Sequence, residues 1–145
     1  MPDRRLRFFV AAFAVAGIGI ASYLGYTHAT DTPLMCPTSG CGKVQQSSYA
    51  ELEGIPVAYL GIVGYALILG VSLSARRAAA TACLVLALAG AAFALYLLVV
   101  QIFVIKAICT WCVSSDGVLL VIVLGAVARI HRLNESRESN AEGRL

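Results

Sequence analysis

Long runs of apolar residues alternate with shorter polar segments along the whole chain. Four apolar windows occur, at about residues 8–26, 55–73, 78–105 and 108–128, and Asp116 is the only charged residue inside them. Because the hydrocarbon core of a bilayer is about 30 Å thick, a helix of roughly 20 apolar residues crosses it. The windows lack the alternation that a membrane barrel strand needs, so we predict four membrane-crossing helices.

The windows are also rich in small residues, which allow helix backbones to approach closely in lipid. These residues are Gly17, Gly19, Ala21, Gly61, Gly64, Gly90, Ala91 and Ala94. The pattern predicts an all-α fold, a polytopic membrane four-helix bundle with a long exoplasmic loop between the first two helices. We expect a single integral membrane domain over residues 1–145, with the bundle at about 8–130 and a polar, frayed cytoplasmic tail at about 131–145.

The basic residues predict the orientation of the bundle. An even number of crossings places all nine arginines on one face: Arg4, Arg5, Arg7, Arg76, Arg77, Arg129, Arg132, Arg137 and Arg144. Since basic residues accumulate on the cytoplasmic side, we expect a multi-pass protein of the cell (inner) membrane with both termini cytoplasmic. A cleaved signal peptide ending near residues 27–29 is the alternative for the first window, and its removal leaves an odd number of helices.

Composition excludes several other classes of protein. The chain is 59% hydrophobic and 13% charged, which leaves too few polar groups to cover a soluble domain of this size. The high apolar content and the absence of a long basic run argue against disorder and against nucleic-acid binding. The net charge of +3 follows from the topology and does not indicate an acidic partner.

The cysteines supply the candidate chemistry. Cys36 and Cys41 lie in the long loop, and Cys109 and Cys112 form a CxxC sequence at the start of the last window. The predicted topology places all four at the exoplasmic face, where the compartment is oxidising. The fifth, Cys83, is interpreted as a small apolar filler in the third helix.

A CxxC sequence at a helix start favours redox chemistry. The unpaired amides and the positive end of the helix dipole stabilise a thiolate, which is the reactive form of cysteine. Cys112 lies one turn deeper than Cys109, so one sulfur can face water and the other lipid. Two structural disulfides and a zinc site made from both pairs are the alternatives. A CxxC disulfide, however, closes too small a loop to stabilise much, and an oxidising compartment disfavours zinc.

Several motifs in chain order resemble the vitamin K epoxide reductase family, specifically its bacterial members. The loop pair comes first, followed by Ser47 six residues after Cys41, then by residues 54–61 (GIPVAYLG), and finally by the CxxC that opens the last helix. The resemblance covers roughly residues 8–130.

The resemblance implies quinone reduction coupled to disulfide formation. Cys36 is implied to take electrons first, through a mixed disulfide with a thioredoxin-like exported thiol oxidase, and Cys41 to pass them on to Cys109. Cys112 is implied to be the thiolate that faces a quinone of the menaquinone or ubiquinone type. Many bacterial members carry a fused thioredoxin-like domain after the last helix. None follows here, so we expect the partner to be a separate protein.

Three further residues are assigned to the quinone site. Ser47 is implied to shape the pocket, or alternatively to cap a short interfacial helix. Asp116 lies one turn after Cys112 and is a candidate for proton delivery, or for a bond to Ser114, Ser115 or a neighbouring helix. Trp111 is a candidate for stacking on the quinone, or belongs to the interfacial aromatic belt.

The family pattern also bears on the substrate. Val57 and Asp116 stand where the animal enzymes have the asparagine and tyrosine that bind the vitamin, which favours simple quinone reduction over epoxide reduction. The alternative function is a non-enzymatic membrane assembly or binding module with structural disulfides. A transporter or heme-handling thiol protein is disfavoured because both histidines, His28 and His131, lie at or beyond the helix ends.

Overall fold

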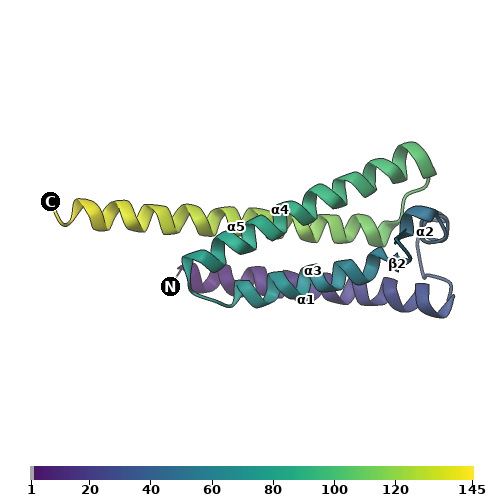
Figure 1. The fold of residues 1–145 in the computed structure, drawn as a ribbon, viewed down its shortest axis with the longest axis horizontal. Coiled ribbons are helices and arrows are strands. Elements are labelled where there is room, and N and C mark those ends of the chain that lie inside the picture. The colour runs from purple at the N-terminus through teal and green to yellow at the C-terminus, as the bar shows by residue number, and fades with distance from the viewer. Residues whose placement is uncertain (1) are drawn as a thin grey trace.

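The computed structural model describes residues 2–145 and consists mainly of helices (Figure 1). The long helices are α1 (Pro2–Thr30), α3 (Val57–Ser72), α4 (Arg77–Val99) and α5 (Thr110–Glu142). Short elements connect α1 to α3: α2 (Gly40–Gln45), η1 (Ser48–Ala50), β1 (Glu51–Leu52) and β2 (Ile55–Pro56). A π-helical segment, η2 (Val100–Ile105), continues α4.

The four long helices form a bundle in which each helix packs against two others. Helix α1 contacts α3 and α5, and α4 contacts the same two helices. Small side chains fill the shared core, since Ala14 and Ala87 are completely buried beside Ile122. At one end of the bundle lie the chain termini and the α3–α4 turn, and at the other end lie α2 and the strands (Figure 1).

Three of the long helices have the length and apolarity to cross a membrane. They cover Asp3–Thr30, Arg77–Ile105 and Thr110–Glu142. Helix α3 is shorter, with 16 residues, and spans about 24 Å at 1.5 Å per residue, less than the roughly 30 Å of a bilayer core. Three of the four predicted crossings therefore have a suitable helix, and the crossing by α3 stays a prediction.

The segment between α1 and α3 is more ordered than the term loop suggests. Helix α1 continues beyond its apolar window to Thr30, and β1 and β2 pair antiparallel with Glu51 opposite Pro56. Glu53 and Gly54 connect the strands with positive φ angles of 53° and 84°. Two consecutive residues with positive φ form the tight hairpin turn that matches the natural twist of paired strands.

The prediction of a frayed C-terminal tail is wrong. Helix α5 continues without a break to Glu142 and extends past the other helices (Figure 1). The tail contains arginine, leucine, glutamate and alanine, which favour helix intrinsically. His131 and Glu135 also face each other one turn apart, with 3.5 Å between Nδ1 and Oε1.

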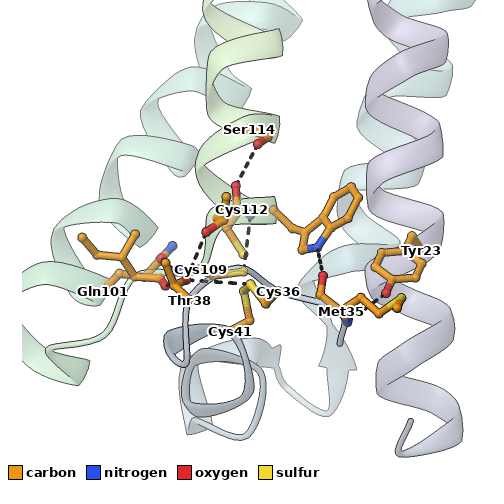
Figure 2. The surroundings of a disulfide bond; sticks show 12 residues. Tyr23, Met35, Cys36, Thr38, Cys41, Gln101, Cys109, Cys112 and Ser114 are labelled. Carbon is orange, nitrogen blue, oxygen red and sulfur yellow. Dashed lines mark hydrogen bonds between the residues drawn. A yellow bond between two sulfur atoms is a disulfide. The ribbon is translucent and has the colours of Figure 1, made fainter. Parts of the chain in front are cut away.

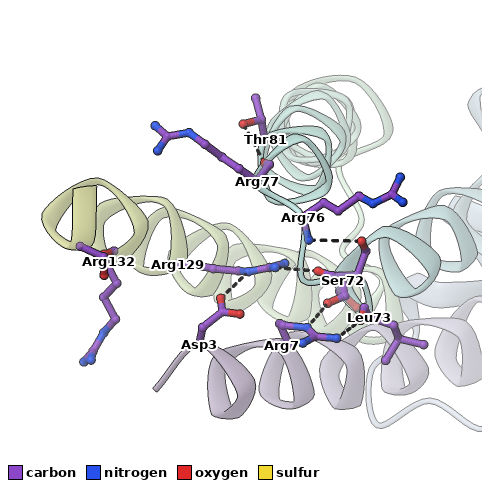
Figure 3. A network of polar contacts seen from close by, with 11 residues as sticks. Asp3, Arg7, Ser72, Leu73, Arg76, Arg77, Thr81, Arg129 and Arg132 are labelled. Carbon is purple, nitrogen blue, oxygen red and sulfur yellow. Dashed lines mark hydrogen bonds and ion pairs between the residues drawn. The ribbon is translucent and has the colours of Figure 1, made fainter. Parts of the chain in front are cut away.

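Two arginines bind carbonyls at the C-terminal end of α3 and in the turn that follows it. Arg129 is 2% exposed, and its guanidinium donates to the Ser74 carbonyl at 2.7 Å and to Asp3 Oδ1 at 2.8 Å. Arg7 donates to the carbonyls of Ser72 and Leu73 (Figure 3). The last carbonyls of a helix have no partner within it, and they carry the negative end of its dipole. The arginines supply the missing donors and the compensating charge.

Candidate active site

The loop cysteines are joined to each other. A disulfide connects Cys36 and Cys41, whose Cα atoms are 6.4 Å apart. Cys41 lies in the first turn of α2 and is 1% exposed, whereas Cys36 precedes the helix and is only half-buried. One sulfur of this disulfide is therefore close to the surface and the other is inside.

The CxxC cysteines carry free thiols at the start of α5. Cys109 is the N-cap residue, is completely buried, and accepts a hydrogen bond from the Cys112 amide at 3.4 Å through its sulfur. Its own amide donates to Gln101 Oε1 at 2.9 Å (Figure 2). Gln101 belongs to η2, so the π-helical segment fixes the backbone from which α5 begins.

The two pairs meet in one cluster. Cys41, Val44 and Cys109 are buried against each other, and Cys36 and Cys112 are packed around them (Figure 2). The four cysteines that the sequence singles out are thus brought together, although about 70 residues separate the pairs. The zinc alternative requires four thiolates, and two of the four sulfurs are already joined to each other.

The environment of Cys109 favours its thiolate. The hydrogen bond from the Cys112 side chain is the largest cause, and with the amides of Cys112 and Trp111 it lowers the pKa of the Cys109 thiol from 9.0 to about 7. Burial opposes this change because it penalises the charged form. The amides at the helix start contribute to this effect as the sequence predicts, but the Cys112 side chain contributes more, and the thiolate is favoured at Cys109.

A second set of contacts ties the loop to α1 and α5. The Trp111 indole donates to the Met35 carbonyl at 3.0 Å, and the Met35 amide donates to the Tyr23 hydroxyl at 3.2 Å. The rings of Tyr23 and Trp111 also pack together, 4.9 Å between centroids. Thr38 lies 3.1 Å from Thr110, oxygen to oxygen. These contacts hold the segment that carries Cys36 next to the CxxC sequence (Figure 2).

A cavity of about 220 Å³ lies beside Cys112. Its walls come from all four long helices and from α2, η1 and η2, and they are mostly apolar, with Ile68, Leu86 and Phe93 among the lining residues. The loop segment therefore closes one side of a space that lies between the helices. The cavity can hold a flat apolar molecule in reach of a thiol.

The structure separates the three residues assigned to the quinone site. Ser47 and Asp116 both line the cavity. Ser47 stands at the N-cap position of η1, but its hydroxyl donates backwards to the Val44 carbonyl at 2.6 Å rather than capping η1. Trp111 is absent from the lining and packs towards α1 instead, so its contact with a quinone stays a prediction.

Some polar residues that line the cavity were not assigned to it from the sequence. They include Gln45, Gln101 and Tyr65, and the Tyr65 hydroxyl lies 2.8 Å from Ser115 Oγ. The sequence did contain a signal for Gln101, because a polar side chain inside an apolar, membrane-crossing window is a candidate for a functional role. The sequence contained no such signal for Gln45, because this residue lies in a polar segment where glutamine is not unusual.

Comparison with known families agrees with this site. The model of the vitamin K epoxide reductase family matches residues 8–127, a range that contains the four clustered cysteines and the cavity. The family implies a membrane oxidoreductase acting on thiols and quinones, in keeping with the apolar helices and with a disulfide packed against a free dithiol. Because the match covers most of the chain, this protein belongs to the vitamin K epoxide reductase family.

Proposed function

We propose that the protein is a membrane thiol:quinone oxidoreductase that reoxidises a separate thioredoxin-like exported thiol oxidase and so drives disulfide formation. Electrons pass from Cys36 and Cys41 through Cys109 and Cys112 to a membrane quinone. One observation carries this proposal. Cys109 is packed against the loop disulfide, whereas Cys112, one turn further, lines an apolar cavity.

The first step occurs at the exposed side of the loop disulfide. A thiolate of the partner attacks Cys36, because Cys36 is only half-buried whereas Cys41 is buried. The S–S bond breaks, a mixed disulfide forms at Cys36, and Cys41 leaves as a thiolate. The second partner thiol then releases the oxidised partner. The exposed Met35 side chain beside Cys36, 84% accessible, offers an apolar contact for the docking partner.

The second step transfers the electrons inside the protein. The freed Cys41 thiolate is packed against Cys109 and attacks it when Cys109 and Cys112 are joined as a disulfide. Cys36 then resolves the Cys41–Cys109 bond, which restores the loop disulfide and leaves the CxxC pair reduced. The arrangement in the structure, with a loop disulfide and two free CxxC thiols, corresponds to the end of this step.

The third step occurs at the cavity. A quinone supplies an acceptor for two electrons and two protons, and the apolar lining fits its ring and lipid tail. Cys112 brings a thiol to the edge of the cavity, and the hydrogen bond from its side chain, together with the amides at the start of α5, lowers the pKa of Cys109.

The arginines support the location that we propose. Arg7, Arg76, Arg77, Arg129 and Arg132 gather at the end of the bundle opposite the cysteines (Figure 3). By the positive-inside rule this end is cytoplasmic, together with both termini, and the thiols are exoplasmic in the cell membrane. Crossing by the short helix α3 is part of this proposal. Arg7, which donates to the carbonyls of Ser72 and Leu73, reduces the cost of ending the helix inside the bilayer.

The proposal is tested in cells that lack their own quinone-linked thiol oxidase. Expression of the full chain with a thioredoxin-like partner is expected to restore oxidation of an exported reporter protein, and Cys112→Ala is expected to abolish it. Cys83→Ala is the matched control, because Cys83 is buried in α4, outside the cluster that holds the other four cysteines. If Cys112→Ala oxidises the reporter as well as the wild type does, the relay is wrong and a structural role for the disulfide is favoured.

A further inference from the structure

Two buried polar atoms without hydrogen-bond partners belong to residues that line the cavity. They are Nε2 of Gln45, at the end of α2, and Oδ2 of Asp116, one turn after Cys112. Within residues 2–145 the remaining such side-chain atom is Nη1 of Arg129, at the opposite end of the bundle. Buried polar groups are almost always paired, so two partnerless atoms at one cavity indicate a ligand that pairs with them.

Three other polar side chains at the cavity already make hydrogen bonds within the protein. The hydroxyl of Ser47 donates to the Val44 carbonyl, and that of Tyr65 contacts Ser115. Oε1 of Gln101 holds the Cys109 amide. Within residues 2–145, Gln45 and Asp116 are the cavity-lining residues that have a buried, partnerless polar atom, so we assign the ligand to these two groups.

The chemistry of these two groups specifies their ligand. The Gln45 amide nitrogen is a hydrogen-bond donor, and a carboxyl in its neutral form is also a donor. The neutral form is the one favoured in an apolar lining, because burying an unpaired carboxylate is costly. Two donors facing an otherwise apolar space match a flat molecule with two carbonyl oxygens and no donor of its own, which describes a quinone.

We propose that Gln45 and Asp116 bind the two carbonyl oxygens of the quinone, and that Asp116 delivers one of the two protons of its reduction. This inference rests on the proposed function. Asp116 gives its proton to one oxygen as the two S–H bonds at Cys109 and Cys112 break and their S–S bond forms. Asp116 then takes up one thiol proton. The other thiol proton is released to water, and water supplies the proton of the second oxygen, which Gln45 holds.

The inference is tested on the full-length protein in lipid nanodiscs, with a menaquinone-type naphthoquinone labelled with ¹³C at its carbonyls. Binding is measured in a Cys112→Ala background, where no turnover occurs. Gln45→Leu is expected to weaken binding about tenfold and to remove the infrared shift of one carbonyl band, because one hydrogen bond is lost. Gln46→Leu is the matched control, since Gln46 is the next residue and is exposed.

Asp116→Asn separates binding from proton delivery. The amide still donates a hydrogen bond but cannot give up a proton, so with Cys112 intact kcat is expected to fall about 100-fold while KM stays within about threefold. Ser114→Ala, an exposed position on the same helix turn, is the control. An unchanged unfolding midpoint and an intact Cys36–Cys41 disulfide verify that each variant is folded.

The possible results distinguish the two proposals. Unchanged binding, carbonyl bands and kcat in both variants overturn the roles of Gln45 and Asp116, while quinone reduction by the wild type still stands. If the wild type neither binds nor reduces the naphthoquinone or a ubiquinone, the proposed function itself is overturned.

Discussion

Gly40 packs directly against the backbone of Ile108, the residue that precedes Cys109. A Cβ added at Gly40 would overlap the Ile108 carbonyl oxygen and lie 2.9 Å from the Ile108 nitrogen. Backbone atoms cannot move aside as a flexible side chain does. A glycine at the first position of α2 therefore allows Cys41, the next residue, to pack against Cys109.

Gly40→Ala is expected to slow electron transfer between the two cysteine pairs. The methyl group pushes α2 away from Ile108, so Cys41 and Cys109 are held too far apart to exchange, and we expect a loss of about tenfold or more because small misplacements of reacting atoms are costly. The measurement is the rate at which a reduced thioredoxin-like partner reduces the CxxC disulfide.

Gly42→Ala is the control for this prediction. Gly42 lies in the same short helix, and a Cβ added there has no atom within 4 Å, so we expect wild-type behaviour. Equal rates in the two variants would contradict the role of this contact.

The acidity of Cys109 is expected to depend on the side chain at position 112. In a background with Cys36, Cys41 and Cys83 replaced, Cys109 is the only thiol of Cys112→Ser and of Cys112→Ala. The serine hydroxyl still donates a hydrogen bond to the thiolate, so its titration midpoint should stay near the pKa of about 7.

Alanine removes that donor, and the midpoint should rise towards 9 because the thiolate loses its largest stabilising contact. At pH 7 the alanine variant should therefore contain much less thiolate than the serine variant. Ultraviolet thiolate absorbance followed against pH measures both midpoints. Identical midpoints would show that the helix amides alone set the acidity of Cys109.

The Trp111 indole is expected to restrain the loop that carries Cys36. Trp111→Phe keeps an aromatic ring beside Tyr23 but removes the hydrogen bond to the Met35 carbonyl. We expect hydrogen exchange of the amides in residues 33–39 to accelerate about fivefold to tenfold, which corresponds to the loss of one ordinary hydrogen bond. Mass spectrometry of the exchanged peptide measures this change. Tyr96→Phe, exposed on α4 away from the loop, is the control, and the absence of any difference from it would rule out this restraint.

The ion pair between Arg129 and Asp3 is expected to stabilise the end of the bundle that holds the α3–α4 turn. It joins α5 to the first turn of α1, and the guanidinium is almost fully buried. Asp3→Asn leaves that charge without its counter-ion, and the free energy of unfolding should fall by about 1–3 kcal/mol, less than for a fully buried pair because Asp3 is partly exposed.

Unfolding in detergent micelles, monitored by circular dichroism, tests this prediction. Arg132→Ala, an exposed arginine one turn further along α5, should change stability by less than about 0.5 kcal/mol. A loss in Asp3→Asn no larger than in Arg132→Ala would mean that the Ser74 carbonyl alone satisfies Arg129.

Local patterns in the sequence predicted the long helices because a chain in lipid must satisfy its backbone hydrogen bonds within each segment. They also indicated the chemistry, since the residue types at Cys109 and Cys112 and their place at a helix start are readable without a structure. Helix lengths were less predictable. Hydrophobic windows mark where lipid can surround a helix, so α3 (Val57–Ser72) nearly matches its window of residues 55–73, whereas α1 and α5 continue into polar sequence.

The sequence by itself determined that the chain is built from apolar helices, that it carries two dithiol pairs, and which family motifs it contains. Tertiary structure alone decided what surrounds those pairs. The contact of Gly40 with Ile108, the place of Trp111 outside the cavity, and the partnerless atoms of Gln45 and Asp116 all depend on how α2 is seated on the start of α5. Such contacts join residues about 70 positions apart, and no local periodicity records them because they arise from packing between separate elements.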